Sequence, residues 1–243
     1  TLSPSSAASD VYKRQVPTVY KVPLILDKQG MGDYVCRRLN LPCKSPKWDE
    51  WSRFVEKLEK PKYSVKIALV GKYAGLADSY VSMNEALRHG GAECGTSVEI
   101  DYIEAEIFEE EPEKISLLKQ YDGIFVPYGF GPRGTEGKIK AINFARENDV
   151  PFLGICYGFQ LAIIEFARNV CKLKGANSTE IDEKPAHPVI DLMPEQRGIT
   201  YKGATMRLGA HKVIIKEGTL AHKLYGTTAV SYTHLTLPTT ERV

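Results

Sequence analysis

The chain has 243 residues, a formal net charge of +2 and a hydrophobic share of 43%. Acidic and basic residues are interspersed, so the composition excludes an obvious nucleic-acid partner or a charged membrane surface. The apolar content suffices for one large or two smaller domains. No apolar run reaches the roughly 20 residues of a membrane span and no signal-peptide pattern opens the chain, so we expect a cytoplasmic protein.

Two terminal stretches differ from the rest of the chain. Residues 1–15 and 231–243 show no periodicity that continues into their neighbours, and both resemble translated adapter or vector sequence. We therefore expect both stretches to be foreign to the fold. The remainder would then be an internal fragment of a longer protein.

Two segments, residues 16–50 and 51–64, precede the main part of the chain. The short apolar pieces of residues 16–50 are too few to build an independent core. Between Trp48 and Lys62, apolar residues such as Trp51 and Leu58 recur at helical spacing, which predicts a helix. Residues 51–64 are accordingly assigned as a linker.

From residue 65 to residue 230, apolar runs alternate with helical patterns. Strands are expected at 65–70, 97–103, 123–127 and 151–155, and helices at 80–89, 112–120, 137–148 and 157–170. Gly90-Gly91 is predicted to stop the first of these helices. This alternation predicts an α/β fold with a doubly wound, mostly parallel sheet. Ligands of such sheets bind beyond the carboxyl ends of the strands, where Gly71, Tyr128-Gly129 and Cys156 are expected to converge.

Five cysteines are spread along the chain: Cys36, Cys43, Cys94, Cys156 and Cys171. Their odd number and the lack of C-x-x-C spacing indicate a reduced chain, without a disulfide scaffold or a zinc site. We expect no metal site.

Cys156 lies at the centre of a Gly154-x-Cys156-x-Gly158 pattern between an expected strand and an expected helix. This is the pattern of a nucleophile elbow, with cysteine as the nucleophile. The glycines relieve crowding in a tight turn, and the start of the helix is expected to favour the thiolate. The alternative is a small buried core residue, the usual place of cysteine.

Two further motifs can serve such a nucleophile. Pro127 to Gly134 is rich in glycine and can offer the second backbone donor of an oxyanion hole, the first being the N–H of Tyr157. The alternative is an ordinary turn. Glu180, in the run Asn177 to Glu180, can hold the ammonium group of an amino acid, or the run can be a helix capping box. Residues 203–209 are expected to be structural.

A cysteine nucleophile requires a base, normally a histidine. In elbow folds that base lies late in the chain, and only His211 and His222 fit this position outside the expected tail. Neither is part of an H-x-E arrangement. The base is therefore expected to be missing from this chain.

Four motifs in this order resemble the CTP synthase family, and within it the class I glutamine amidotransferase domain. They are residues 127–138, 151–160, 177–180 and 205–209, while residues 20–24 and 33–36 resemble the end of the amidoligase domain. The resemblance implies that residues 16–50 are the end of the amidoligase domain and that residues 65–230 are an incomplete amidotransferase domain. The resemblance implies that glutamine is hydrolysed through a thioester and that the ammonia aminates UTP to CTP at the expense of ATP, in pyrimidine biosynthesis.

The resemblance also implies residue roles and partners. Cys156 would be the nucleophile, and the oxyanion hole would use Gly129 and Tyr157. Glutamine would contact Gly129, Tyr157, Gly158, Phe159, Gln160 and Glu180. No cofactor is expected in this fragment, since ATP and Mg²⁺ would bind the parent's amidoligase domain. The parent is expected to be a homotetramer.

Two departures from the family pattern leave alternatives open. Tyr128 stands where the family usually has glycine, and the family's catalytic His and Glu and a glutamine-binding Arg would lie beyond residue 230. We therefore expect the parent to be an enzyme and this C-terminally truncated chain to be inactive. The alternatives are another class I amidotransferase or a Cys-elbow hydrolase, and a degenerate domain that binds glutamine or a partner without turnover.

Overall fold

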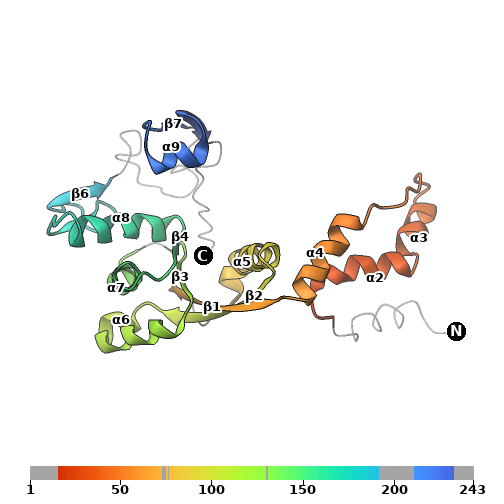
Figure 1. Ribbon diagram of the computed structural model, residues 1–243, viewed down its shortest axis with the longest axis horizontal. Helices are drawn as coiled ribbons and strands as arrows, with labels where there is room; N and C mark the ends of the chain where they lie inside the picture. The colour runs from red at the N-terminus through yellow and green to blue at the C-terminus, as the bar shows by residue number, and fades with distance from the viewer. Residues whose placement is uncertain (1–15, 73–74, 76, 130, 192–210, 233–243) are drawn as a thin grey trace. The chain divides into compact units, whose positions relative to one another are not determined.

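The computed structural model describes residues 16–72, 75, 77–129, 131–191 and 211–232. The described residues divide between two compact units, one within residues 1–127 and 133–153 and one within residues 128–132 and 154–243. Figure 1 shows the helices and strands of both. Among the described residues, no helix combines the length and apolarity needed to cross a membrane. Each of the five cysteines is a free thiol.

The first unit begins with short helices that precede the sheet. They are the 3-10 turn η1 (Val19–Lys21), α2 (Val22–Lys28) and α3 (Met31–Arg38), none of which buries a residue. This agrees with the expectation that residues 16–50 build no core of their own. The helix predicted between Trp48 and Lys62 is confirmed as α4 (Asp49–Glu59), whose Val55 is buried.

A four-stranded sheet forms the centre of the first unit. Its strands are β1 (Tyr63–Gly71), β2 (Thr96–Glu104), β3 (Gly123–Val126) and β4 (Phe152–Gly154), in the order β2-β1-β3-β4. β1 pairs in parallel with both β2 and β3, so that Leu69 lies opposite Tyr102 and Phe125. The chain turns to one side of β1 and then to the other, which confirms the α/β, doubly wound sheet.

Helices connect these strands and bury the sheet. They are η2 (Ala77–Tyr80), α5 (Val81–Glu93), α6 (Ile107–Glu110), η3 (Pro112–Gln120) and α7 (Thr135–Glu147). The core contains Leu69 and Val70 of β1, Phe125 of β3 and Ala141 of α7, all fully or almost fully buried. The central strand β3 is apolar and fully buried, as expected of a covered parallel strand, whereas the edge strand β2 contains acidic residues and buries none of its residues.

The expected helix stop at Gly90-Gly91 is wrong, because α5 continues through both glycines to Glu93. Gly91 is buried, and a Cβ there would lie 2.6 Å from Val98 Cγ2 and 2.7 Å from the carbonyl oxygen of Thr96. The glycine is therefore explained by the close approach of α5 to β2.

The strand predicted at residues 151–155 is present but is not buried. Leu153 is 48% exposed and Ile155 is 39% exposed. The reason is topological: among the described strands β4 is the last in the sheet order, so one of its edges has no described neighbour.

The second unit contains α8 (Tyr157–Asn169), which buries Leu161 and Ile164. β5 (Ala176–Ser178) pairs in parallel with β6 (His187–Ile190). β7 (His211–Ile214) pairs antiparallel with β8 (Ala229–Tyr232), and α9 (Leu220–Tyr225) lies between them in sequence. β8 includes the first two residues of the expected tail 231–243, and residues 203–209 lie outside the described part.

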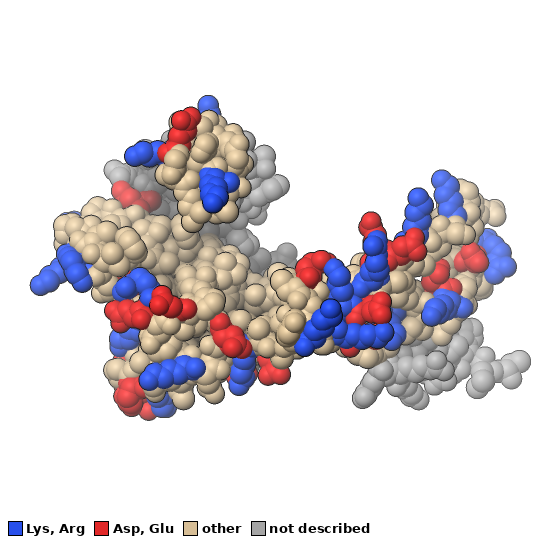
Figure 2. Space-filling model, viewed as in Figure 1, with Lys and Arg blue, Asp and Glu red and all other residues tan. Residues whose placement is uncertain are grey.

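The charges agree with the composition. On the face drawn in Figure 2, Lys and Arg side chains alternate with Asp and Glu over the described surface, without an extended area of one sign. Many form ion pairs, among them Lys57 with Glu93 and Lys66 with Asp101. The face drawn therefore has no single-sign area of the kind that attracts a polyanion.

Candidate active site

Cys156 has the backbone of a nucleophile elbow. Its φ of 55° and ψ of −110° are rarely adopted by a residue with a side chain. α8 begins at the next residue, and the N–H groups of Phe159 and Gln160 both donate to the carbonyl oxygen of Cys156, at 3.1 Å. Backbone of this kind costs about 1–3 kcal/mol and is concentrated at functional sites.

The thiol of Cys156 is less acidic than the sequence suggests. Burial raises its pKa, the N–H of Tyr157 hydrogen-bonds to the sulfur and lowers the pKa, and the carboxylate of Glu180 raises it further. The start of α8 was expected to favour the thiolate. That contribution is present, but burial and the neighbouring carboxylate outweigh it.

The glycine-rich loop contacts the elbow. Gly129 and Gly131 have φ angles of 135° and 86°, which favour glycine, so the loop bends as the sequence predicts. The hydroxyl of Tyr157 donates to the carbonyl oxygen of Gly131 at 3.5 Å, and Tyr157 is buried. Sequence reasoning used only the N–H of Tyr157 and missed its hydroxyl, since one sequence does not show which way that side chain points. Tyr128 is half-buried in the same loop.

Glu180 lies in a turn that follows β5. Its N–H donates to the hydroxyl of Ser178 at 3.2 Å, and the N–H of Asp182 donates to the carbonyl oxygen of Ser178 at 3.0 Å. No helix begins at Ser178 or Thr179, so the capping-box interpretation is wrong. The carboxylate of Glu180 is exposed, and it is close enough to Cys156 to raise the pKa of the thiol.

The first turn of α8 presents two contrasting side chains. Phe159 is 59% exposed, whereas the Oε1 atom of Gln160 is buried and has no hydrogen-bond partner among the described residues. A buried acceptor without a partner is uncommon and requires an explanation. Gly158 is buried. The structure thus brings Cys156, Tyr157, Gly129 and Glu180 into one unit, while their catalytic and binding roles stay predictions.

Of the two candidate bases, only His222 has a described side chain, since His211 is described by its backbone alone. Among the described side chains, no histidine hydrogen-bonds to Cys156: His89 contacts Tyr20, and His187 opens β6. His222 lies in α9, where its N–H donates to the cap residue Thr219. Within the same described ranges, no cluster of three His, Cys, Asp or Glu side chains is arranged to hold a metal ion.

Comparison with known proteins places these features in a family. The model for glutamine amidotransferase class-I matches residues 75–236, and the chain belongs to that family. It is 54% identical over 226 residues to CTP synthase of Methanocaldococcus jannaschii, a match that covers 91% of this chain and 42% of the relative. It is 52% identical over 231 residues to CTP synthase of Thermococcus gammatolerans, a match that covers 95% of this chain and 43% of that relative.

A solved structure gives the same result. The glutaminase domain of Trypanosoma brucei CTPS with bound acivicin is 36% identical, with a TM-score of 0.60, over 70% of this chain and 66% of that one. The resemblance to CTP synthase and to its amidotransferase domain is thereby confirmed. The chain spans about two fifths of the length of these curated relatives.

Proposed function

We propose that this chain forms the glutamine-hydrolysing part of a CTP synthase, with Cys156 as the nucleophile. The observation that carries the proposal is the strained backbone of Cys156 at the start of α8, in a chain of the class-I amidotransferase family. The sulfur attacks the side-chain amide carbon of glutamine, the carbon–nitrogen bond breaks, and a thioester forms. The amide nitrogen takes up a proton and leaves as ammonia. Water then attacks the thioester, which releases glutamate and restores the thiol.

The oxyanion of the tetrahedral intermediate needs donors that are already in position. The N–H of Tyr157 points at the sulfur, and the N–H of Gly129 is the second donor of this proposal. One such donor contributes about 3 kcal/mol to transition-state stabilisation. One group must take the thiol proton as a base and return it as an acid to the leaving nitrogen, a role that no histidine with a described side chain fills.

Glutamine is recognised by the groups around the thiol. In this proposal Glu180 pairs with the α-ammonium group, which is supported by the action of its carboxylate on the neighbouring Cys156. The buried Oε1 of Gln160 offers a further acceptor, and the exposed ring of Phe159 offers an apolar surface. Gly158 leaves room beside the elbow.

The remaining partners follow from the same proposal. Ammonia released here aminates UTP in an ATP-dependent step on the rest of the parent protein, where Mg²⁺ also acts, while this chain needs no cofactor. The parent is a homotetramer in the cytoplasm, and the five free thiols suit a reducing compartment.

Covalent labelling tests the proposal. The full chain is treated with acivicin, the compound bound to the trypanosomal relative, and each cysteine is mapped by mass spectrometry. Selective labelling of Cys156 that glutamine suppresses is expected, with Cys171→Ala as the matched control and Cys156→Ala as the blank. Equal labelling of all cysteines would contradict a glutamine site.

A second function is favoured by the raised pKa of Cys156, which leaves less thiolate at neutral pH. In this alternative, the chain binds glutamine without turning it over. Calorimetry with glutamine and an ammonia assay on the same sample separate the two functions. Binding without ammonia release supports the alternative, and ammonia release that is lost in Cys156→Ala supports the enzyme.

A further inference from the structure

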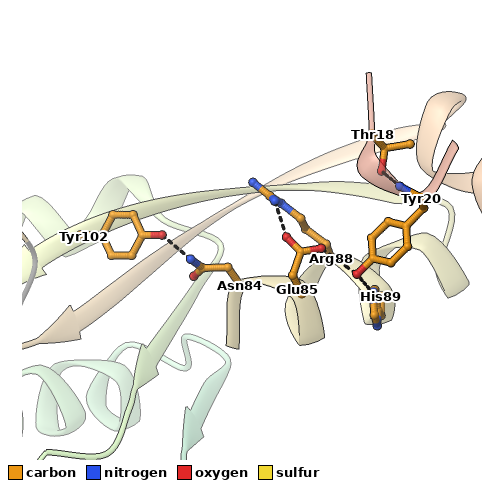
Figure 3. A network of polar contacts seen from close by, with 7 residues as sticks. All are labelled: Thr18, Tyr20, Asn84, Glu85, Arg88, His89 and Tyr102. Carbon is orange, nitrogen blue, oxygen red and sulfur yellow. Dashed lines mark hydrogen bonds and ion pairs between the residues drawn. The ribbon is translucent and has the colours of Figure 1, made fainter. Parts of the chain in front are cut away.

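The start of the described chain is attached to α5 through Tyr20. The Tyr20 hydroxyl donates to Glu85 Oε2 at 2.9 Å and lies 2.6 Å from His89 Nε2 (Figure 3). Its ring packs edge-on against Phe54 and His89, with centroid distances of 5.3 and 5.2 Å. Its carbonyl oxygen accepts from Trp51 Nε1 at 2.7 Å. We call Tyr20, Trp51, Phe54, Glu85 and His89 the clasp.

The hydrogen bonds of the clasp have a defined direction. Glu85 accepts the proton of the Tyr20 hydroxyl, so His89 must donate from Nε2 to the same oxygen. Arg88 Nη1 binds the other oxygen of Glu85 at 2.5 Å, which fixes the carboxylate. Tyr20 is therefore held by a donor and an acceptor that both belong to α5.

A second set of contacts leads from α5 toward the end of β1. Asn84, the neighbour of Glu85, is buried, and its Nδ2 donates to the hydroxyl of Tyr102 on β2 at 2.6 Å (Figure 3). The Tyr102 ring stacks on that of Tyr80, with 6.2 Å between centroids and 19° between planes. Tyr80 is fully buried.

The last contact reaches the main chain at the carboxyl edge of the sheet. The N–H of Lys72, directly after β1, donates to the Tyr80 hydroxyl at 3.2 Å. Gly71 leaves the space for this hydroxyl, since a Cβ there would lie 2.5 Å from it. We call Asn84, Tyr102, Tyr80 and Lys72 the relay. On α5 (Val81–Glu93), the relay uses Asn84, and the clasp begins at the next residue, Glu85, and continues to His89.

We propose that the clasp and the relay are one coupling device, through which docking of residues 16–21 on α5 sets the main chain at Lys72. α5 carries adjacent residues, Glu85 and Asn84, that engage the clasp and the relay, so a shift of the helix at Tyr20 moves both. Any effect of this coupling on glutamine hydrolysis rests on the proposed function. The coupling between Tyr20 and the main chain at Lys72 is independent of it.

Hydrogen exchange in the full chain tests the coupling. Tyr20→Phe removes the hydroxyl and keeps the ring, and Tyr63→Phe is the matched control, because Tyr63 is 69% exposed on β1 and outside both groups. In Tyr20→Phe, exchange at the Lys72 amide is expected to rise about tenfold, as the loss of one hydrogen bond to a charged group predicts. In Tyr63→Phe it should stay at the wild-type rate.

A double-mutant cycle with Tyr80→Phe decides whether the effect travels through the relay. If it does, Tyr20→Phe adds little to the exchange rate of Lys72 once Tyr80 has lost its hydroxyl. Additive effects, or an unchanged Lys72 amide in Tyr20→Phe, would overturn the proposal. Acivicin labelling of Cys156 on the same variants is a separate readout, so failure of the glutamine site leaves the exchange result decisive.

Discussion

Gly137 of α7 lies directly against the backbone carbonyl of Ala105, and a Cβ at Gly137 would be 1.9 Å from that oxygen. The obstacle is main chain, which cannot move aside as a flexible side chain can. Close packing of α7 on the segment after β2 therefore requires glycine at this position.

Gly137→Ala is accordingly expected to lower the free energy of unfolding by about 3 kcal/mol, because the overpacked contact must separate α7 from residue 105. Urea unfolding followed by circular dichroism measures it. Gly90→Ala is the control: Gly90 lies within α5 with nothing within 4 Å of its added Cβ, so the change should stabilise by about 1 kcal/mol. Equal effects of both changes would contradict this account.

Replacement of Cys156 separates strain from chemistry. Cys156→Gly and Cys156→Ala both remove the thiol, but only glycine adopts a φ of 55° with a ψ of −110° at low cost. The glycine variant is expected to be the more stable by about 1 kcal/mol, measured as the difference in thermal unfolding. A more stable alanine variant would show that the elbow holds no strain.

The alkylation of Cys156 should reveal its raised pKa. The rate with iodoacetamide at increasing pH is expected to have its midpoint above that of an unstructured cysteine peptide, mainly because of burial. Glu180→Gln removes a charge that disfavours the thiolate, so the midpoint should fall and the rate at pH 7.5 should rise severalfold. Glu183→Gln, an exposed change three residues further along the chain, serves as the control. An unchanged midpoint in Glu180→Gln would show that the carboxylate of Glu180 does not affect the pKa of the Cys156 thiol.

Lys138 gives the first unit a distinct pH dependence. Its side chain is fully buried, and burial, followed by the charge of Lys72, lowers its pKa to about 8 from an ordinary 10.5. The unfolded chain binds the proton more tightly than the folded chain. Lys138 therefore lowers the free energy of unfolding by its full amount below pH 8, and this destabilisation disappears as the pH rises to 10.5.

Lys138→Met should therefore stabilise the protein at pH 7 by roughly 2–3 kcal/mol and flatten the rise of stability between pH 8 and 10.5. Urea unfolding at several pH values measures both effects. Lys119→Met, on the exposed side of η3, is the control and should leave the pH slope as it is in wild type. If the free energy of unfolding still rises between pH 8 and 10.5 in Lys138→Met, other titrating groups cause the rise.

The parts of the fold that sequence predicts are those determined by local pattern. The alternation of apolar strands and helices predicts β1 to β3 and α4, α7 and α8, and the Gly154-Cys156-Gly158 spacing predicts the elbow backbone. In each case the residues that make the pattern are neighbours along the chain.

The features that sequence missed depend on partners distant in the chain. Gly91 serves the contact of α5 with Thr96 and Val98, and not the end of the helix. Leu153 is exposed because of the place of β4 in the sheet order. The pKa of Cys156 is raised because the fold buries the thiol and brings Glu180 to it. None of these facts is a property of neighbouring residues.

The positive φ of Cys156 also limits which residues can replace the nucleophile during evolution or engineering. Serine keeps one substituent on Cβ and fits the same turn. Threonine adds a methyl group, and a β-branched side chain is severely strained at such a φ. A hydroxyl nucleophile at this elbow can therefore be serine but not threonine, whatever the reactivity of the threonine hydroxyl.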